Sequence, residues 1–285
     1  MSEDNAPAPT SSDKCYTDYH LGNTDAEHER LIRQGIRLAP VTERFLREVG
    51  IGSGQLVLDL GAGVGDVAML VARIVGPSGK VVAIERDART INRARARAAD
   101  AGLGNIEFVQ TDVTEYSTDL IFDAAVGRYI LQFLADPVDA LRSVAQRIRP
   151  DGILAFQEGS WIPFLALSRH LPLWYASVSL LHETGIRAGV NLEMGPGLHK
   201  AFQDAGLPAP HMRLEIEMAS DPDFTRWVSD SLRSVLPQIQ KLNLSIEALG
   251  DLDTLQERLQ NEVAMSNTVV PWIGLVAAWC RNPEN

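Results

Sequence analysis

Glycines and acidic side chains follow successive apolar runs of this sequence, at the points where buried strands would end. Gly61 and Gly63 come directly after the apolar run 56–60, Glu85 ends a second run and Asp112 ends a third. Glycines let the backbone approach a ligand closely, and an acid after the second strand of a nucleotide-binding unit accepts hydrogen bonds from ribose hydroxyls. This spacing predicts a site for a nucleotide-type cofactor.

Apolar runs alternate with amphipathic segments through the first half of the chain. The runs are 56–60, 80–85, 105–112, 120–127 and 153–158. Helical periodicity lies between them, and Asp136-Pro137 is typical of a helix start. Alternation of this kind predicts an α/β fold with a Rossmann-like, doubly wound parallel sheet. Since the carboxyl ends of parallel strands meet at one edge, the glycines and acids are expected to lie together there.

The segments together resemble class I S-adenosylmethionine-dependent methyltransferases, notably the bacterial small-molecule group that includes quinone-ring C-methyltransferases. The resemblance covers residues 50–160. The motifs that carry it are Val-Leu-Asp-Leu-Gly-Ala-Gly-Val-Gly-Asp (57–66), Ala-Ile-Glu-Arg-Asp (83–87), Val-Gln-Thr-Asp-Val (109–113), Phe-Asp-Ala-Ala-Val (122–126) and Arg-Pro-Asp-Gly-Ile-Leu (149–154).

The resemblance implies S-adenosylmethionine as cofactor, with S-adenosylhomocysteine as product. The glycine turn would lie under the methionine part, Glu85 would hold the ribose, and Asp112 with Val113 would flank the adenine. Arg128 stands where many members carry a small or amide residue. The expected cofactor-binding residues are Tyr19, Gly61, Ala62, Gly63, Glu85, Arg86, Asp112, Val113 and Arg128.

The N-terminal part of the chain divides into two segments. Residues 1–14 are rich in Ala, Pro, Ser and Thr and predict a disordered tail. Residues 15–50 predict a helical lid, in which Thr24-x-x-Glu27 is a capping box and Pro40 restarts the helix. Tyr16, Tyr19 and His20 either close over the cofactor, as in many related methyltransferases, or make ordinary packing contacts.

After the core at 51–159 the chain departs from simple alternation. Residues 160–194 predict a cap insertion, 195–220 a core helix and strand, 221–266 a helical cap insertion, and 267–285 a final edge strand and tail. In the resembled family the last two strands form an antiparallel edge pair, placed here at 211–218 and 268–279. The expectation is a seven-stranded sheet, its last strand antiparallel, with a mostly helical cap.

The cap insertions predict the kind of acceptor. They are rich in Trp, Phe, Leu and Met, which favours a small apolar or aromatic acceptor, unless those side chains only form the core of the cap. Methyl transfer needs no obligatory nucleophile, but an oxygen or nitrogen acceptor often needs a base. C-methylation of an alkene instead leaves a carbocation that a carboxylate or an aromatic face could stabilise. Glu158 and His182 are the candidate catalytic residues, against the alternatives of a capping carboxylate and a surface histidine.

Bulk properties exclude several classes of function. The net charge is -11 and the pI is near 5.0, which disfavours nucleic acid because phosphate would be repelled. Arg86, Arg89, Arg93 and Arg97 form a stripe typical of a solvated helix face.

Two distant cysteines and scattered histidines suggest neither a disulfide framework nor a metal site. The N-terminus has no signal-peptide pattern, and the longest apolar stretch, 161–181, is interrupted by charges and prolines. We expect a cytoplasmic protein without a membrane span, for which a homodimer is one possible assembly.

Two other functions remain open from the sequence. A homologue could bind S-adenosylmethionine without transferring methyl, as a regulator or a cyclase. An NAD(P)-dependent oxidoreductase also uses a glycine turn and an acid after the second strand. However, the Gly-x-Gly-x-Gly spacing differs from Gly-x-Gly-x-x-Gly, and no tyrosine lies in a Tyr-x-x-x-Lys motif.

Overall fold

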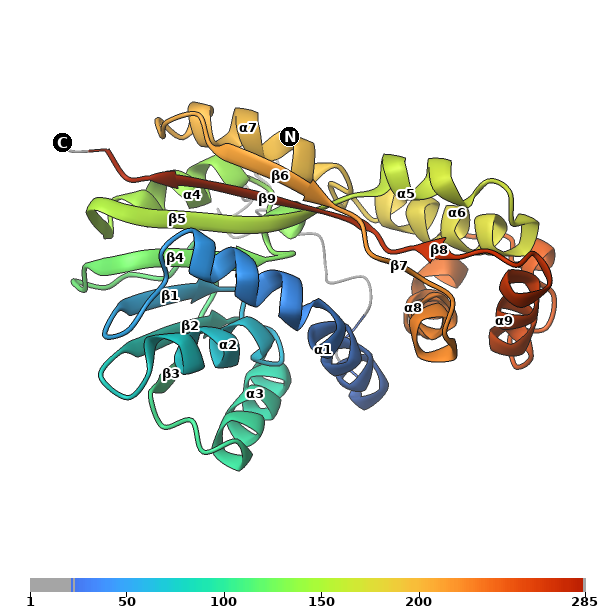
Figure 1. The fold of residues 1–285 in the computed structure, drawn as a ribbon, viewed down its shortest axis with the longest axis horizontal. Helices are drawn as coiled ribbons and strands as arrows, with labels where there is room; N and C mark the ends of the chain where they lie inside the picture. The colour runs from blue at the N-terminus through green and yellow to red at the C-terminus, as the bar shows by residue number, and fades with distance from the viewer. Residues whose placement is uncertain (1–21, 23, 284–285) are drawn as a thin grey trace, which may run out of the picture.

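A seven-stranded sheet forms the centre of the computed structural model, which describes residue 22 and residues 24–283 (Figure 1). The strand order is β3-β2-β1-β4-β5-β9-β6, and β9 runs antiparallel to both of its neighbours. This arrangement confirms the predicted fold class. The strands are β1 (Leu56–Leu60), β2 (Lys80–Glu85), β3 (Ile106–Gln110), β4 (Phe122–Arg128), β5 (Ile148–Ser160), β6 (His211–Glu215) and β9 (Gly274–Arg281).

The last predicted strand divides into two. β8 (Val270–Pro271) pairs with β7 (Met218–Ala219) in a separate ribbon, and β9 begins only at Gly274. Between them the Trp272 amide donates to the Glu217 carbonyl at 2.7 Å, so the chain leaves the main sheet and passes into the cap. The predicted antiparallel pairing holds for β6 and β9, while β5 pairs with the other edge of β9.

Helices cover both faces of the sheet (Figure 1). α1 (Asp25–Glu48) and α2 (Asp66–Val75) pack on one face, where their apolar side chains share a core with Val57, Val81 and Val126. α3 (Ala88–Asp100) contacts β2 and β3. The opposite face is covered by α4 (Pro137–Ala145) and α7 (Met194–Asp204), with the short helix η1 (Leu131–Phe133) after β4.

Helix α1 begins at the predicted cap, where Thr24 Oγ1 accepts from the Glu27 amide at 3.2 Å. Pro40 does not restart it, because one continuous helix runs through the proline. α1 lies very close to α2: a Cβ built on Gly35 would lie 2.2 Å from Asp66 Cγ. Only glycine leaves room for this approach, which brings α1 over the carboxyl ends of the strands.

Four helices form a cap beyond the carboxyl ends of the strands (Figure 1). They are α5 (Trp161–Ser168), α6 (Pro172–Arg187), α8 (Pro222–Lys241) and α9 (Leu255–Met265), with η2 (Glu247–Leu249) between the last two. Buried aromatic rings, including those of Trp174, Phe224 and Trp272, form its core. Within residues 24–283, every helix is too short or too polar to cross a membrane.

Distant glutamates cap the first two cap helices. Glu193 accepts hydrogen bonds from Ser160 Oγ at 2.7 Å and from the Trp161 and Ile162 amides at 2.6 and 2.8 Å at the start of α5. Glu262 of α9 accepts from the Leu173 and Trp174 amides of α6, both at 2.8 Å. The caps therefore join segments far apart in the sequence, and they replace local capping side chains that neither helix has.

Candidate functional site

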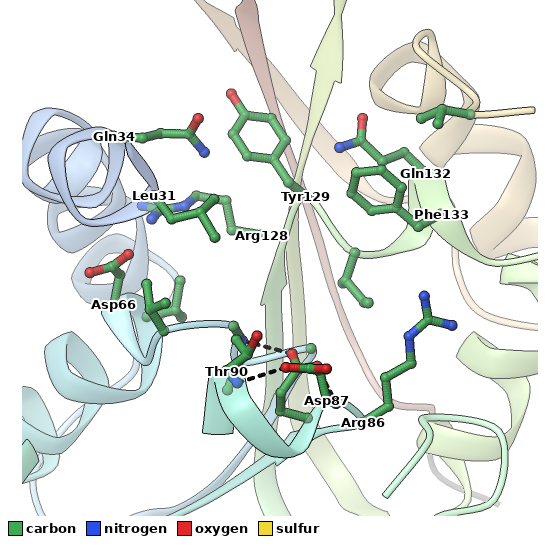
Figure 2. A pocket seen from close by; sticks show the side chains of 18 of the residues that line it. Leu31, Gln34, Asp66, Arg86, Asp87, Thr90, Arg128, Tyr129, Gln132 and Phe133 are labelled. Atoms are coloured by element: carbon green, nitrogen blue, oxygen red, sulfur yellow. Dashed lines mark hydrogen bonds between the residues drawn. The ribbon is translucent and has the colours of Figure 1, made fainter. Parts of the chain in front are cut away.

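A cavity of about 250 Å³ lies where the strand ends, α1 and the cap meet. Figure 2 shows Leu31 and Gln34 of α1 on one side, Gln132 and Phe133 on the other, and Tyr129 between them. Core residues in its wall are Gly61, Ala62, Gly63, Val64, Ile84, Glu85, Arg86, Asp112, Val113 and Arg128. Cap residues in its wall include Trp161, Leu181, Val190, Leu192, Trp227, Ser231 and Val235.

Glu85 connects the end of β2 to the glycine turn. Its Oε2 accepts from the Gly63 amide at 3.0 Å and its Oε1 accepts from the Asp87 amide at 2.9 Å. Burial raises the pKa of this carboxyl, while the two backbone N–H groups oppose that rise. Each carboxylate oxygen can accept further hydrogen bonds, so the side chain stays competent to hold a ribose.

The glycine turn offers space rather than spare hydrogen-bond donors. The Ala62 amide donates to the Ile84 carbonyl at 2.8 Å and the Gly65 amide to the Ala62 carbonyl at 2.9 Å. A Cβ on Gly63, whose φ is +53°, would meet no atom within 4 Å. A Cβ on Gly61 would instead lie 2.4 Å from Ile130 Cδ1. Gly63 therefore borders the open cavity, and Gly61 allows close packing beneath it.

Asp112, Val113 and Arg86 lie together in the wall after β2 and β3. Asp112 Oδ1 accepts from the amide and the hydroxyl of Thr114 at 2.9 and 2.8 Å, which fixes the carboxylate beside the cavity. Val113 is half-buried and packs against the apolar core next to it. The two residues expected to flank an adenine are thus brought to the same wall as Glu85.

Arg128 places a cation in the cavity wall at the end of β4. Its Nη1 donates to Thr42 Oγ1 at 2.9 Å, and Thr42 in turn donates to Gln157 Oε1 at 2.8 Å. It has no ion-pair partner in the described part of the chain, and burial lowers the pKa of its guanidinium. Asp59, buried nearby, has its pKa raised to about 8 by burial, against the effect of Arg128. The arginine is therefore available to an anionic ligand group.

Glu158 is fully buried and is not among the cavity-lining residues. Its Oε1 accepts from the Ile130 and Leu131 amides at 2.9 and 2.7 Å, and burial raises its pKa to about 8. The carboxyl therefore holds the loop after β4 from behind. Its expected role as a catalytic base stays a prediction; the observed contacts are those of a positioning residue.

His182 of α6 is half-buried and also lies outside the cavity wall. Its ring is 5.7 Å from the ring of Trp161, measured between centroids. Burial lowers its pKa, opposed by the charge of Glu193. A catalytic role for His182 stays a prediction; the ring that it contacts, that of Trp161, does line the cavity.

Several cavity residues were not expected from the sequence. Tyr129 and Gln132 come from the loop after β4, and Arg30, Leu31 and Gln34 come from α1. Tyr129 could have been suspected, because it lies two residues after the fourth predicted strand. The α1 residues carry no signal of their own, since their position depends on how α1 crosses the sheet. Tyr16, Tyr19 and His20 lie outside the described residues.

The arginine stripe of α3 does more than face solvent. Arg89 pairs with Asp25 at 2.7 Å and Arg93 with Glu29 at 2.5 Å, both on α1, while Arg97 pairs with Asp66 at 2.8 Å. Surface pairs contribute little stability individually. Together they orient α1 along one side of the cavity. In the described ranges, no three His, Cys, Asp or Glu residues are grouped as metal ligands would be.

Comparisons with known proteins agree on the core. Residues 51–186 match the family described as "Methyltransferase domain". The ubiquinone/menaquinone biosynthesis C-methyltransferase UbiE of Pseudomonas putida is 36% identical over 121 residues, 41% of this chain and 47% of that protein. This chain thus spans about half the length of the curated relatives it matches. The matches confirm the resemblance found in the sequence.

Solved structures resemble a larger part of the chain. One from Bacillus halodurans C-125 has a TM-score of 0.57 and 17% identity, and covers 85% of this chain and 99% of its own. The cyclase SpnF has a TM-score of 0.52 and 19% identity, and covers 87% of this chain and 86% of its own. At these identities the similarity concerns the fold alone.

Proposed function

We propose that this chain transfers a methyl group from S-adenosylmethionine to a small, largely apolar acceptor. The match of residues 51–186 to the family described as "Methyltransferase domain" supports this proposal. The observation that carries the proposal is one cavity bounded by Gly63, Glu85, Asp112 and Arg128 on the core side and by aromatic side chains on the cap side. The polar and the apolar parts of the wall thus border the same cavity.

The residues of the core wall fit the parts of the donor. Glu85 would hold the ribose hydroxyls, and Asp112 with Val113 would flank the adenine. Open space above Gly63 would take the methionine part. The carboxylate of that part would be an ion-pair partner for Arg128, which has none among the described residues. A charge-assisted hydrogen bond of this kind is roughly twice as strong as a neutral one, so Arg128 would make a large contribution to binding.

When bound, the donor supplies an electrophilic methyl carbon on a sulfonium. The acceptor atom would form a bond to that carbon as the carbon–sulfur bond breaks, the electron pair of that bond would go to sulfur, and the acceptor would lose its proton to solvent. The chain's task is to hold the acceptor in line and to exclude water. Leu181, Val190 and Trp227 of the cap, together with Leu31 of α1, provide apolar surface for that purpose.

The test is a transfer assay with methyl-labelled S-adenosylmethionine and a panel of small aromatic and apolar acceptors. Label in an acceptor, together with calorimetric binding of S-adenosylhomocysteine, supports the proposal. Tight binding with all label kept in the donor favours a non-methylating homologue, such as a regulator or a cyclase. Absence of binding by well-folded protein contradicts the cofactor assignment.

A further inference from the structure

Two side chains in the cavity wall, Gln132 and Tyr129, each carry a polar group that has no hydrogen-bond partner among the described residues. Gln132 is only 9% exposed, yet its amide makes no side-chain hydrogen bond with the described residues. Tyr129 Oη is also buried, and no hydrogen bond of ordinary geometry reaches it from the described chain. The nearby Trp272 indole can only donate, so the Tyr129 hydroxyl proton has no acceptor there. Buried polar groups without partners are uncommon in folded proteins.

The backbone holds both side chains in fixed positions. Tyr129 has a φ of +56°, a left-handed conformation that is costly for a bulky residue, and its amide donates to the Gln157 carbonyl at 2.9 Å. Such strain is found where the surrounding structure fixes a functional side chain. The Gln132 carbonyl accepts from the Asn191 amide at 3.0 Å. Glu158 fixes the two residues between them through their amides.

The cap side of this end of the cavity is largely apolar. The cap contributes Trp161, Trp227 and Leu181 to the wall, and Ile273 comes from the segment before β9. Trp161 and Trp227 are at most 9% exposed. The Trp227 indole N–H also has no hydrogen-bond partner among the described residues. Figure 2 shows Tyr129 between Gln34 of α1 and the Gln132 and Phe133 side chains. Aromatic side chains make favourable contacts with another ring, so this end of the cavity suits a mostly apolar ring.

We propose that the acceptor is a flat ring carrying a hydroxyl or carbonyl oxygen, and that Tyr129 and Gln132 select it by hydrogen bonding to that oxygen. This inference rests on the proposed function and specifies its acceptor class. A tyrosine hydroxyl and a glutamine amide can each donate and accept, so the pair matches a phenol as well as a ring ketone. A site built to bond an oxygen rejects the analogue that lacks it, because its own polar groups stay unpaired.

The experiment compares 1-naphthol with 1-methylnaphthalene, which has nearly the same shape but no hydroxyl. Their Kd values are measured by quenching of tryptophan fluorescence, with and without saturating S-adenosylhomocysteine. The wild-type chain should bind 1-naphthol about 25-fold more tightly, as two neutral hydrogen bonds of about fivefold each imply. Tyr129→Phe and Gln132→Met should each weaken 1-naphthol about fivefold and leave 1-methylnaphthalene unchanged.

The variants are matched to the wild type in shape. Phenylalanine keeps the ring and has the same left-handed backbone cost, and methionine keeps the unbranched length of glutamine. Val190→Ala, in the same wall, is the control that should weaken both probes equally. Circular dichroism and Tm establish that each variant folds.

Separate outcomes decide this inference and the proposed function. Three results would overturn the oxygen-selective acceptor site. The wild type could bind the two probes with equal affinity, it could bind neither probe, or the two variants could affect both probes equally. If S-adenosylhomocysteine still binds in those cases, the proposed function stands. A preference for 1-naphthol without any binding of S-adenosylhomocysteine supports the oxygen site and contradicts the methyl-donor assignment.

Discussion

The Gly63 amide donates to Glu85 Oε2 at 3.0 Å, so a single carboxylate joins the glycine turn to the end of β2. The second oxygen of Glu85 holds the Asp87 amide, at the start of α3. Three segments that border the cavity are thereby fixed before any ligand arrives. Such preorganisation lowers the ordering cost of binding.

Gly63→Arg should abolish donor binding, because the side chain would occupy the open space above the turn. We expect the Kd of S-adenosylhomocysteine, measured by calorimetry, to rise at least about a hundredfold, roughly 2.8 kcal/mol. Gly102→Arg is the matched control: Gly102 also has a positive φ, +68°, and open space, but it lies outside the cavity wall. Wild-type affinity in Gly63→Arg would remove the glycine turn from the site.

Arg128→Gln should weaken the donor through its carboxylate alone. Loss of a hydrogen bond to a charged group corresponds to about 10-fold to 100-fold in the Kd of S-adenosylhomocysteine. 5′-Methylthioadenosine, which has the adenosine and sulfur but no amino-acid tail, should bind the variant and the wild type equally. An equal loss for both ligands would show that Arg128 acts on the shape of the site and not on the carboxylate.

Glu158→Gln should change the pH dependence of stability. Burial raises the pKa of Glu158 to about 8, from 4.5 in an ordinary glutamate. Between these values the folded chain keeps a proton that the unfolded chain has lost, so the contribution of Glu158 to stability is full below pH 4.5 and declines as pH rises toward 8. The slope is at most about 1.4 kcal/mol per pH unit.

The measurement is urea unfolding of wild type and Glu158→Gln from pH 5 to pH 9. The free energy of unfolding of the wild type should fall relative to that of the variant up to about pH 8, then run parallel to it. Asp59 has a similarly raised pKa, but it is present in both proteins and cancels in the difference. Parallel curves over the whole range would mean that Glu158 is not buried as described.

Glu262→Ala should destabilise the cap, because it leaves the Leu173 and Trp174 amides at the start of α6 without their acceptor. Loss of a helix cap costs about 1–2 kcal/mol in the free energy of unfolding. The control is Glu257→Ala, an exposed glutamate on the same helix. If the two variants lose equal stability in urea unfolding, the remote cap makes no measurable contribution.

The sequence was most informative where a residue acts through local backbone geometry. The glycine turn, the acids after β2 and β3, and the Asp136 cap of α4 were all predictable, because strand ends and helix starts have short-range signatures. The antiparallel direction of the last strand followed from the family resemblance and was also right. Pro40 was misleading, because buried neighbours such as Leu38 and Phe45 keep α1 continuous through it.

The acceptor side of the cavity could not be predicted in the same way. Tyr129 and Gln132 reach it through a loop whose shape depends on the buried Glu158, at the end of another strand. Leu31 and Gln34 depend on the contact between Gly35 and Asp66, which joins two helices distant in sequence. Glu158 itself was assigned by its position at the end of a strand, and only the fold shows that it lies behind the cavity wall.

Strand β9 lies between β5 and β6, although it comes after both in the sequence. During synthesis on a ribosome, which makes the chain from its N-terminus, the two neighbours must wait with unpaired edges until residues 274–281 emerge. Ile273, directly before this strand, completes the cavity wall at the same moment. Closure of the sheet and completion of the acceptor site are therefore a single late folding event. A nascent chain that stalls before this event would expose two unpaired strand edges, which chaperones or other chains could bind.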